Sequence, residues 1–308
     1  MFLPITWPIT WPFLSTLAVV LAAVGGMIDA ARAEQPPDTV HFLSADGTTT
    51  LTGYLFMPAQ PRATRSPAVV MMHGRAGPYS LNVKDTGPYD ATTLSRRHKQ
   101  WGEIWSNLGY IAVLVDGFGP RGFSGGFGPH SIGERPDEVN EVTVRPLDAY
   151  GALAWLRSRP DVAPDRIGLM GWSNGGSATL AAMAEDAPGI IEHSAEAGFR
   201  AALVFYAGCG LRNRYKSQDY VPYATVLEFH GTADSETRYA LCNRLVDKSR
   251  AAGGDIELVS YPDATHDFDD PGRNRQSVPA NQSARADAIG RAQQFFERVL
   301  AQDLPPRR

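Results

Sequence analysis

RIGLMGWSNGGSATLAAMAE, residues 166–185, decides how this chain folds. Its first part, RIGLMG, is a short apolar run that predicts a buried strand, and NGGSATLAAMAE follows at once with a helical pattern. Between them stands Ser173, flanked by glycines at positions 171 and 175 in the pattern GxSxG. Strand, sharp turn and helix in this order expose a serine hydroxyl at the end of a sheet, so Ser173 is the candidate nucleophile.

The same pattern occurs a second time as GFSGG, residues 122–126. The strand-like run IAVLVD ends at Asp116, well before Ser124, and Gly and Pro follow where a helix should begin, which favours a glycine-rich loop. GFGPRG, residues 117–122, also fits GxGxxG, but Pro120 argues against the helix that a dinucleotide-binding turn must open. We therefore predict neither a nucleophile nor a nicotinamide or flavin site in this loop.

Apolar runs and amphipathic segments alternate along the rest of the chain. The runs that predict strands are TVHFLSADG and TTLTGYLFM, which form an opening hairpin, and then PAVVMMH, IAVLVD, RIGLMG, RAALVFYAG, TVLEFHG and IELVSYP. Such strands, separated by helices, are typical of a mainly parallel sheet with helices on both faces. We predict a single α/β domain over residues 34–308, with ligands at the carboxyl ends of the strands. Three long loops, residues 74–90, 117–140 and 267–283, are candidate walls of the cleft.

Overall composition is that of an ordinary globular protein. Of the 308 residues, 20% are charged and 43% are hydrophobic, and the net charge is −4. No basic excess is present to hold a polyanion, so we expect no nucleic-acid partner.

The amino-terminal residues 1–33 differ in composition from the rest. WPFLSTLAVVLAAVGGMI is apolar, and Ala31 and Ala33 are small residues at the positions that a signal peptidase reads. We predict a signal peptide cleaved after Ala33, export to the periplasm or the cell exterior, and no membrane association afterwards. MFLPITWPITW lacks the Lys or Arg of a usual signal peptide, so an uncleaved membrane anchor is the alternative.

Export bears on the two cysteines, Cys209 and Cys242. In an oxidising compartment they can form a disulfide, and the alternative is two buried free thiols. Neither cysteine has metal-ligand spacing to another Cys or to a His, so we expect no metal site.

Ser173 needs a base and an orienting acid. Asp234 lies in HGTAD just after the predicted strand TVLEFHG, and His266 lies in YPDATHDF just after IELVSYP. Parallel strands bring their carboxyl ends to one edge, so we predict a triad in the order Ser, Asp, His. His193 and His230 stand between Ser173 and Asp234 and fit this order poorly.

Each assignment has an alternative. Asp234 can instead cap the helix predicted from SETRYALC, and His266 can be a surface histidine. The acids close to His266 in sequence can replace Asp234 as the orienting group; they are Asp263, Asp267 and Asp269.

The oxyanion of an acyl-transfer reaction needs two donors. We predict the backbone N–H of Asn174 as one, and that of Arg75 or Ala76, in HGRAG after the strand PAVVMMH, as the other. His73 begins this loop, and we interpret it as a brace without a role in proton transfer.

With HGRAG, GWSNGG, HGTAD and ATH in this order, the chain resembles the dienelactone hydrolase family of the α/β-hydrolase fold, from about residue 50 to 302. DGFGPRG and FYAGC are similar to segments of its secreted, serine-bearing branch. The resemblance implies the triad Ser173, Asp234 and His266, no metal or other cofactor, and a monomer or weak dimer. Dienelactone hydrolases proper carry a cysteine at the elbow and an acid near the oxyanion loop, which puts dienelactone in doubt as substrate.

The residues fit an exported serine carboxylesterase that acts on a small-molecule ester through an acyl-enzyme. The alternatives are a peptidase of the prolyl-oligopeptidase type, and a catalytically silent α/β-hydrolase module that only binds. Candidate substrate contacts are Arg121, Phe118 and Trp172.

Overall fold

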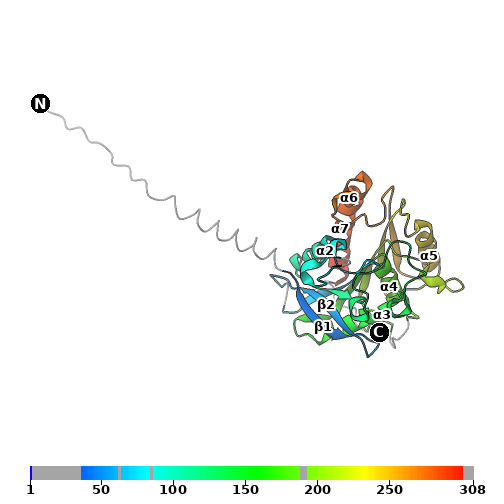
Figure 1. Ribbon diagram of the computed structural model, residues 1–308, viewed down its shortest axis with the longest axis horizontal. Coiled ribbons are helices and arrows are strands. Elements are labelled where there is room, and N and C mark those ends of the chain that lie inside the picture. The colour runs from blue at the N-terminus through cyan, green and yellow to red at the C-terminus, as the bar shows by residue number, and fades with distance from the viewer. Residues whose placement is uncertain (2–35, 62–63, 84–85, 188–192, 301–308) are drawn as a thin grey trace. The chain divides into compact units, whose positions relative to one another are not determined.

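The structure, a computed structural model, describes residues 36–61, 64–83, 86–187 and 193–300 together with Met1. Pro37–Arg308 forms one compact unit (Figure 1). The predicted signal peptide, residues 1–33, lies outside the described residues apart from Met1. Within the described part of the chain, no helix has the length and apolar character needed to span a membrane.

Eight strands of the described residues form one sheet, in the spatial order β1-β2-β4-β3-β5-β6-β7-β8. β2 pairs antiparallel with β1 and β4, and the remaining neighbours pair in parallel. The strands are β1 (Asp38–Leu43), β2 (Thr50–Phe56), β3 (Ser66–Met72), β4 (Ile111–Asp116), β5 (Val162–Trp172), β6 (Ala201–Phe205), β7 (Val226–Gly231) and β8 (Ile256–Tyr261). The predicted hairpin and mainly parallel sheet are confirmed.

Helices cover both faces of this sheet (Figure 1). Residues of α3 (Arg145–Ser158), α4 (Asn174–Met183) and α5 (Tyr239–Ala251) contribute to the apolar core on one face. Residues of α2 (Arg96–Asn107) and α7 (Pro279–Leu300) contribute to the core on the other, and the short helix α6 (Arg273–Gln276) precedes α7. The prediction of helices on both faces is confirmed.

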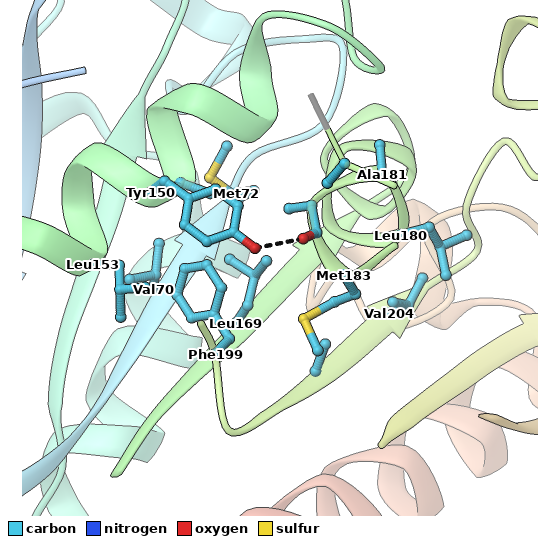
Figure 2. Close-up of a cluster of buried hydrophobic side chains, with 14 of the residues drawn as sticks. Val70, Met72, Tyr150, Leu153, Leu169, Leu180, Ala181, Met183, Phe199 and Val204 are labelled. Atoms are coloured by element: carbon cyan, nitrogen blue, oxygen red, sulfur yellow. Dashed lines mark hydrogen bonds between the residues drawn. The ribbon is translucent and has the colours of Figure 1, made fainter. Parts of the chain in front are cut away.

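Alternation along the strands explains the two cores. On β3, Val70 and Met72 point into the first core, and Val69 and Met71 point into the second. Figure 2 shows the first core, where the ring of Tyr150 lies beside that of Phe199 among apolar side chains. Its hydroxyl donates a hydrogen bond of 2.6 Å to a backbone carbonyl of α4. Because the buried hydroxyl has this acceptor, the tyrosine contributes apolar area without an unsatisfied polar group.

Helix α5 begins later than the sequence pattern indicates. The pattern SETRYALC predicts a helix from Ser235, whereas α5 begins at Tyr239 with Arg238 as its N-cap. The carboxylate of Asp234 accepts hydrogen bonds from the backbone N–H groups of Glu236 and Thr237, each 2.8 Å long, and so closes a separate turn before the helix. Asp234 is therefore not the cap of α5.

Candidate active site

Ser173 stands alone between β5 and α4 in a strained conformation. Its φ of 52° and ψ of −113° are unusual for a residue with a side chain. Its N–H donates to the carbonyl of Phe205 on β6, while its own carbonyl accepts the first helical hydrogen bond of α4, from Ser177. The sheet and the helix thus hold the turn from both sides.

The glycines of GxSxG make this turn possible. A Cβ on Gly175 would lie 2.0 Å from the carbonyl oxygen of Met72, and a Cβ on Gly171 would lie 2.3 Å from that of Gly175. Helix α4 can approach the strands this closely only without these side chains. The predicted elbow is therefore present, and its hydroxyl lies at the carboxyl end of the sheet.

The structure brings Ser173, His266 and Asp234 together. Nε2 of His266 lies 3.1 Å from Oγ of Ser173, and Nδ1 of His266 lies 2.7 Å from Oδ2 of Asp234. All three residues are at most 7% exposed. One imidazole therefore joins a serine hydroxyl to a carboxylate, the arrangement that activates a serine in acyl transfer.

Asp234 accepts hydrogen bonds from groups other than His266. Thr237 Oγ1 donates to Oδ2 of Asp234 over 2.7 Å, in addition to the two backbone donors of the turn. Burial alone would raise the pKa of Asp234, but hydrogen bonds from His266 and Thr237 hold that pKa below its usual value. The carboxylate therefore stays charged beside the imidazole.

The other acids near His266 in sequence have different partners. Asp267 forms ion pairs with Arg97 and with Arg275 on α6. Asp269 is buried and accepts a hydrogen bond from Nε1 of Trp172, among others. Asp263 makes a hydrogen bond through its backbone N–H to a threonine hydroxyl. Of these acids and Asp234, only Asp234 has a hydrogen bond to His266 among the described residues.

Glu236 is a neighbour of the catalytic candidates that sequence reasoning missed. One carboxylate oxygen lies 3.8 Å from Nε2 of His266, and Arg75 holds both oxygens, with Nη2 2.8 Å from Oε2. The Arg75 contact offsets burial and keeps the pKa of Glu236 below its usual value. The signal available in the sequence was its place two residues after Asp234, in the same turn.

The backbone groups predicted for the oxyanion site lie around Ser173. Helix α4 begins at Asn174, so the N–H groups of its first turn have no acceptor within the helix. Arg75 and Ala76 line the same cavity as Ser173. Buried Arg145 ties the two parts together, since its Nη1 donates to the carbonyl of His73 and to the side chain of Asn174.

His73 lies at the base of this loop. Its Nδ1 lies 2.7 Å from the carbonyl oxygen of Gly74, and its ring packs edge-on against Phe118. Complete burial lowers the pKa of His73 well below the usual value, so the imidazole is neutral. Its position agrees with the predicted brace.

Two cavities meet at Ser173. The first, about 730 Å³, is lined by the loop from Gly74 to Asn82, the start of α2 and the segment after His266. The second, about 610 Å³, is lined by residues near His130, by the loop that follows β6 and by Glu236. Parts of all three long loops that were predicted as cleft walls therefore line a cavity.

The structure corrects the three predicted substrate contacts, since none of them lines either cavity. Arg121 is bound by the carboxylate of Asp148 through two hydrogen bonds of 2.8 and 2.9 Å. Phe118 and Trp172 are fully buried. Trp172 belongs to the apolar core beneath the site, where its Nε1 donates to Asp269. For Arg121, local sequence did not reveal the partner because Asp148 lies 27 residues further along the chain.

Cys209 and Cys242 form a disulfide, the first of the two alternatives considered. Cys209 lines the second cavity, and Cys242 is buried on α5. The bond therefore fastens the loop after β6, which borders the site, to a helix of the core.

Replacing both cysteines with serine is expected to lower the free energy of unfolding by about 3 kcal/mol, because the unfolded chain regains the entropy of a closed loop. Urea denaturation of the wild-type and double-variant proteins without reductant would measure the difference. The disulfide would be contradicted if thiol titration of the denatured wild type found two free thiols.

Comparison with known proteins identifies the family to which this chain is similar. Residues 107–300 match the model of the dienelactone hydrolase family. The chain is 26% identical over 277 residues to Homo sapiens dipeptidyl peptidase 8, covering 81% of this chain and 28% of that protein. It is 28% identical over 218 residues to a probable dipeptidyl-aminopeptidase B of Uncinocarpus reesii, covering 64% of this chain and 22% of that protein. The chain thus spans about a quarter of the length of these relatives.

Similar solved structures include Thermogutta terrifontis esterase 2. Its form phosphorylated by paraoxon has 20% identity and a TM-score of 0.58, with 86% of this chain and 95% of that chain covered. Its propionate-bound form has 20% identity and a TM-score of 0.57, with 88% of this chain and 98% of that chain covered. The likeness confirms the α/β-hydrolase fold.

The family match spans more than half of the chain and includes β5, α4, β7 and β8, the elements that carry Ser173, Asp234 and His266 or precede them directly. The resemblance seen in the sequence motifs is thereby confirmed. This chain belongs to the dienelactone hydrolase family.

Proposed function

We propose that this hydrolase is a serine esterase that cleaves carboxylic esters through an acyl-enzyme. The supporting observation is the hydrogen-bonded series from Ser173 through His266 to Asp234, at the point where two cavities meet. The structural likeness to an esterase agrees with this activity. Two cavities that share Ser173 suit an ester, because its acyl and alcohol parts extend from the carbonyl carbon in different directions.

Acylation begins when Oγ of Ser173 attacks the acyl carbon and its proton moves to Nε2 of His266. Asp234 accepts the hydrogen bond of the other ring nitrogen and stabilises the imidazolium that forms. The tetrahedral intermediate collapses as the carbon–oxygen bond to the alcohol breaks, and the alcohol leaves with the proton from His266. The acyl group then remains on Ser173.

Deacylation repeats these steps with water. His266 takes a proton from water, the hydroxide attacks the acyl carbon, and the bond to Oγ breaks as Ser173 regains its proton. In both halves the oxyanion is held by the backbone N–H of Asn174 and by that of Arg75 or Ala76. The turn at Ser173 places its hydroxyl directly before the first turn of α4, whose N–H groups have no acceptor within the helix.

The cavity linings favour a substrate that carries a negative charge. Arg96 and Arg273 are exposed and line the first cavity, and no ion pair involves either of them among the described residues. Arg135 lines the second cavity, where its guanidinium donates to Ser131. An acyl or alcohol group that bears a carboxylate would complement these charges.

Arg273→Glu is expected to raise KM for an aryl hemisuccinate about fivefold, because an attraction of the usual surface magnitude becomes a repulsion. KM for the corresponding neutral aryl butyrate should hardly change. Arg250→Glu makes the same change of charge at an exposed position of α5 outside both cavities and serves as the control. Equal effects of Arg273→Glu on both esters would refute the preference for an anionic substrate.

Peptide-bond cleavage is the second candidate, favoured by the similarity to dipeptidyl peptidase 8. The two activities separate in a comparison of kcat/KM for an aryl ester and for a dipeptidyl anilide. We expect the ester to be turned over at least about 100-fold more efficiently. The carboxylates of Glu141 and Glu236, which line the second cavity, are each paired with an arginine and so are not free to bind a peptide amino terminus. Preference for the anilide would establish the peptidase instead.

We also propose that the protein acts outside the cytoplasm, after cleavage behind Ala33. The disulfide between Cys209 and Cys242 supports this, because disulfides persist in oxidising compartments. Amino-terminal sequencing of the protein recovered from its native compartment tests the proposal. A chain that begins at Ala33 or earlier would contradict cleavage at this position.

A further inference from the structure

Two ionisable side chains occupy the middle of strand β7, where the neighbouring positions are apolar. Glu228 and His230 are both 0% exposed and, two residues apart, lie on the same side of the strand. Phe229 between them points into the core on the opposite face. Burying such groups is costly unless they are paired, so this placement in a sheet calls for a role.

Both ring nitrogens of His230 face acceptors. Nδ1 lies 3.2 Å from Oε1 of Glu228, and Nε2 lies 3.0 Å from the carbonyl oxygen of Thr237. A neutral imidazole donates from one nitrogen only, whereas an imidazolium donates from both. Burial opposes the charge, but Glu228 and Asp234 outweigh it and raise the pKa of His230. An acceptor at each ring nitrogen favours a charged His230 that is paired with Glu228.

This ion pair lies directly behind the triad. Nε2 of His230 is 3.6 Å from Oδ2 of Asp234, the same oxygen that contacts Nδ1 of His266. Thr237 links the two histidines further, since its carbonyl accepts from His230 and its hydroxyl donates to Asp234. Glu228 lies at the opposite edge of the imidazole, so the positive charge of the pair is the one nearer to Asp234.

We propose that His230, paired with Glu228, is a positioning residue that fixes Asp234 beside His266. The proposal rests on the esterase function. A cation behind Asp234 offsets part of the negative field that this carboxylate exerts on His266. The ability of His266 to act as a base is therefore expected to depend on the charge at His230.

Within the described part of the chain, few other charged or titratable groups face the two histidines. His230 is faced by Glu228, by Asp234 and, at 6.0 Å between ring centroids, by Tyr239 of α5. The sulfur atoms beside Glu228 belong to the disulfide and do not titrate. A change at His230 thus alters one charge in this group.

Around His266 the titratable and charged groups are Asp234, Glu236, Asp267 and Tyr206. Glu236 and Asp267 are each paired with an arginine. None of these groups contacts His230 except Asp234, so the effect of His230 on His266 passes through that carboxylate.

The test is the pH profile of kcat/KM for His230→Gln on a neutral aryl ester. Glutamine can still donate to the carbonyl of Thr237 but carries no charge. We expect the acid limb, which reports His266, to move upward by about half a pH unit, with about threefold lower kcat/KM below the limb and an unchanged KM. His193→Gln, whose ring packs on Tyr223 away from the triad, should keep the wild-type profile.

A second variant distinguishes the effect of the lost charge of His230 from the effect of lost stability. His230→Gln leaves Glu228 buried without its cation, which destabilises the protein, and Glu228→Gln in the same chain removes that carboxylate. The double variant should regain stability and keep the raised acid limb, because the positive charge is still missing. An acid limb at the wild-type pH in the folded double variant would overturn the proposal, whatever its activity at the plateau.

The esterase proposal itself is checked in the same assay with Ser173→Ala. If the wild type and Ser173→Ala are equally inactive on esters, the esterase function fails and the role of His230 falls with it. A different outcome is an active wild type, an inactive Ser173→Ala and an acid limb that does not move in His230→Gln. In that case only the proposed role of His230 fails. The pH dependence of inactivation by a fluorophosphonate gives the same limb without substrate turnover.

Discussion

Ser173→Ala is expected to lower kcat on an aryl ester by at least about 10³-fold, with the fold unchanged. Alanine has no hydroxyl, so the bond to the acyl group cannot form, and only the oxyanion donors and substrate binding remain. The strained backbone of the turn is set by β5, β6 and α4 rather than by the hydroxyl, so far-ultraviolet circular dichroism should match the wild type.

Ser124→Ala is the matched control, because Ser124 sits in the other GxSxG match of the chain. In the structure Ser124 lines a different cavity, together with residues of β1 and β2, and has no hydrogen bond to a histidine among the described residues. Its replacement should leave kcat within about twofold of the wild type. Retention of most activity by Ser173→Ala would remove Ser173 as the nucleophile.

Asp234→Asn is expected to lower kcat by about 10³- to 10⁴-fold while KM changes little. The amide is nearly the same shape, but it has no negative charge to stabilise the imidazolium of His266. An amide nitrogen facing Nδ1 would also favour the tautomer in which Nε2 carries the proton and cannot accept another from Ser173. Steady-state kinetics on a soluble aryl ester measures the loss.

Asp263→Asn is the corresponding control, because Asp263 is much nearer than Asp234 to His266 in the sequence but is exposed. Its side chain has no hydrogen bond to His266, so activity should be preserved. Equal losses in the two variants, or a loss at Asp263 alone, would show that the orienting acid had been assigned wrongly.

The triad candidates could be found from the sequence because their positions follow from the order of strands. Ser173, Asp234 and His266 each come at or shortly after the end of a parallel strand, and parallel strands end at one edge of the sheet. Once the alternation of strands and helices is recognised, the side chains that can meet at that edge are few.

The substrate contacts could not be found in this way, because they depend on pairings across the fold. Arg121 meets Asp148 on α3, and Arg75 meets Glu236, a residue 161 positions further along the chain. Nothing in the local pattern around either arginine distinguishes a cavity wall from an ion pair. Glu236 and Arg145 were missed for the same reason.

Trp172 is a different case, because strand alternation held the information. Met170 and Trp172 are two residues apart on β5 and both point into the core that α2 and α7 cover. Proximity to Ser173 in sequence favoured a substrate contact, whereas the side-chain period of two places the indole beneath the sheet edge. The period is the more reliable guide at the end of a strand.

In the proposed mechanism, His266 activates Ser173. The most direct measurement is labelling of the folded protein with a fluorophosphonate probe, followed by mapping of the modified peptide. We expect one label, on Ser173, which is lost in His266→Ala. A label on Ser124, or no label on folded protein, would contradict it.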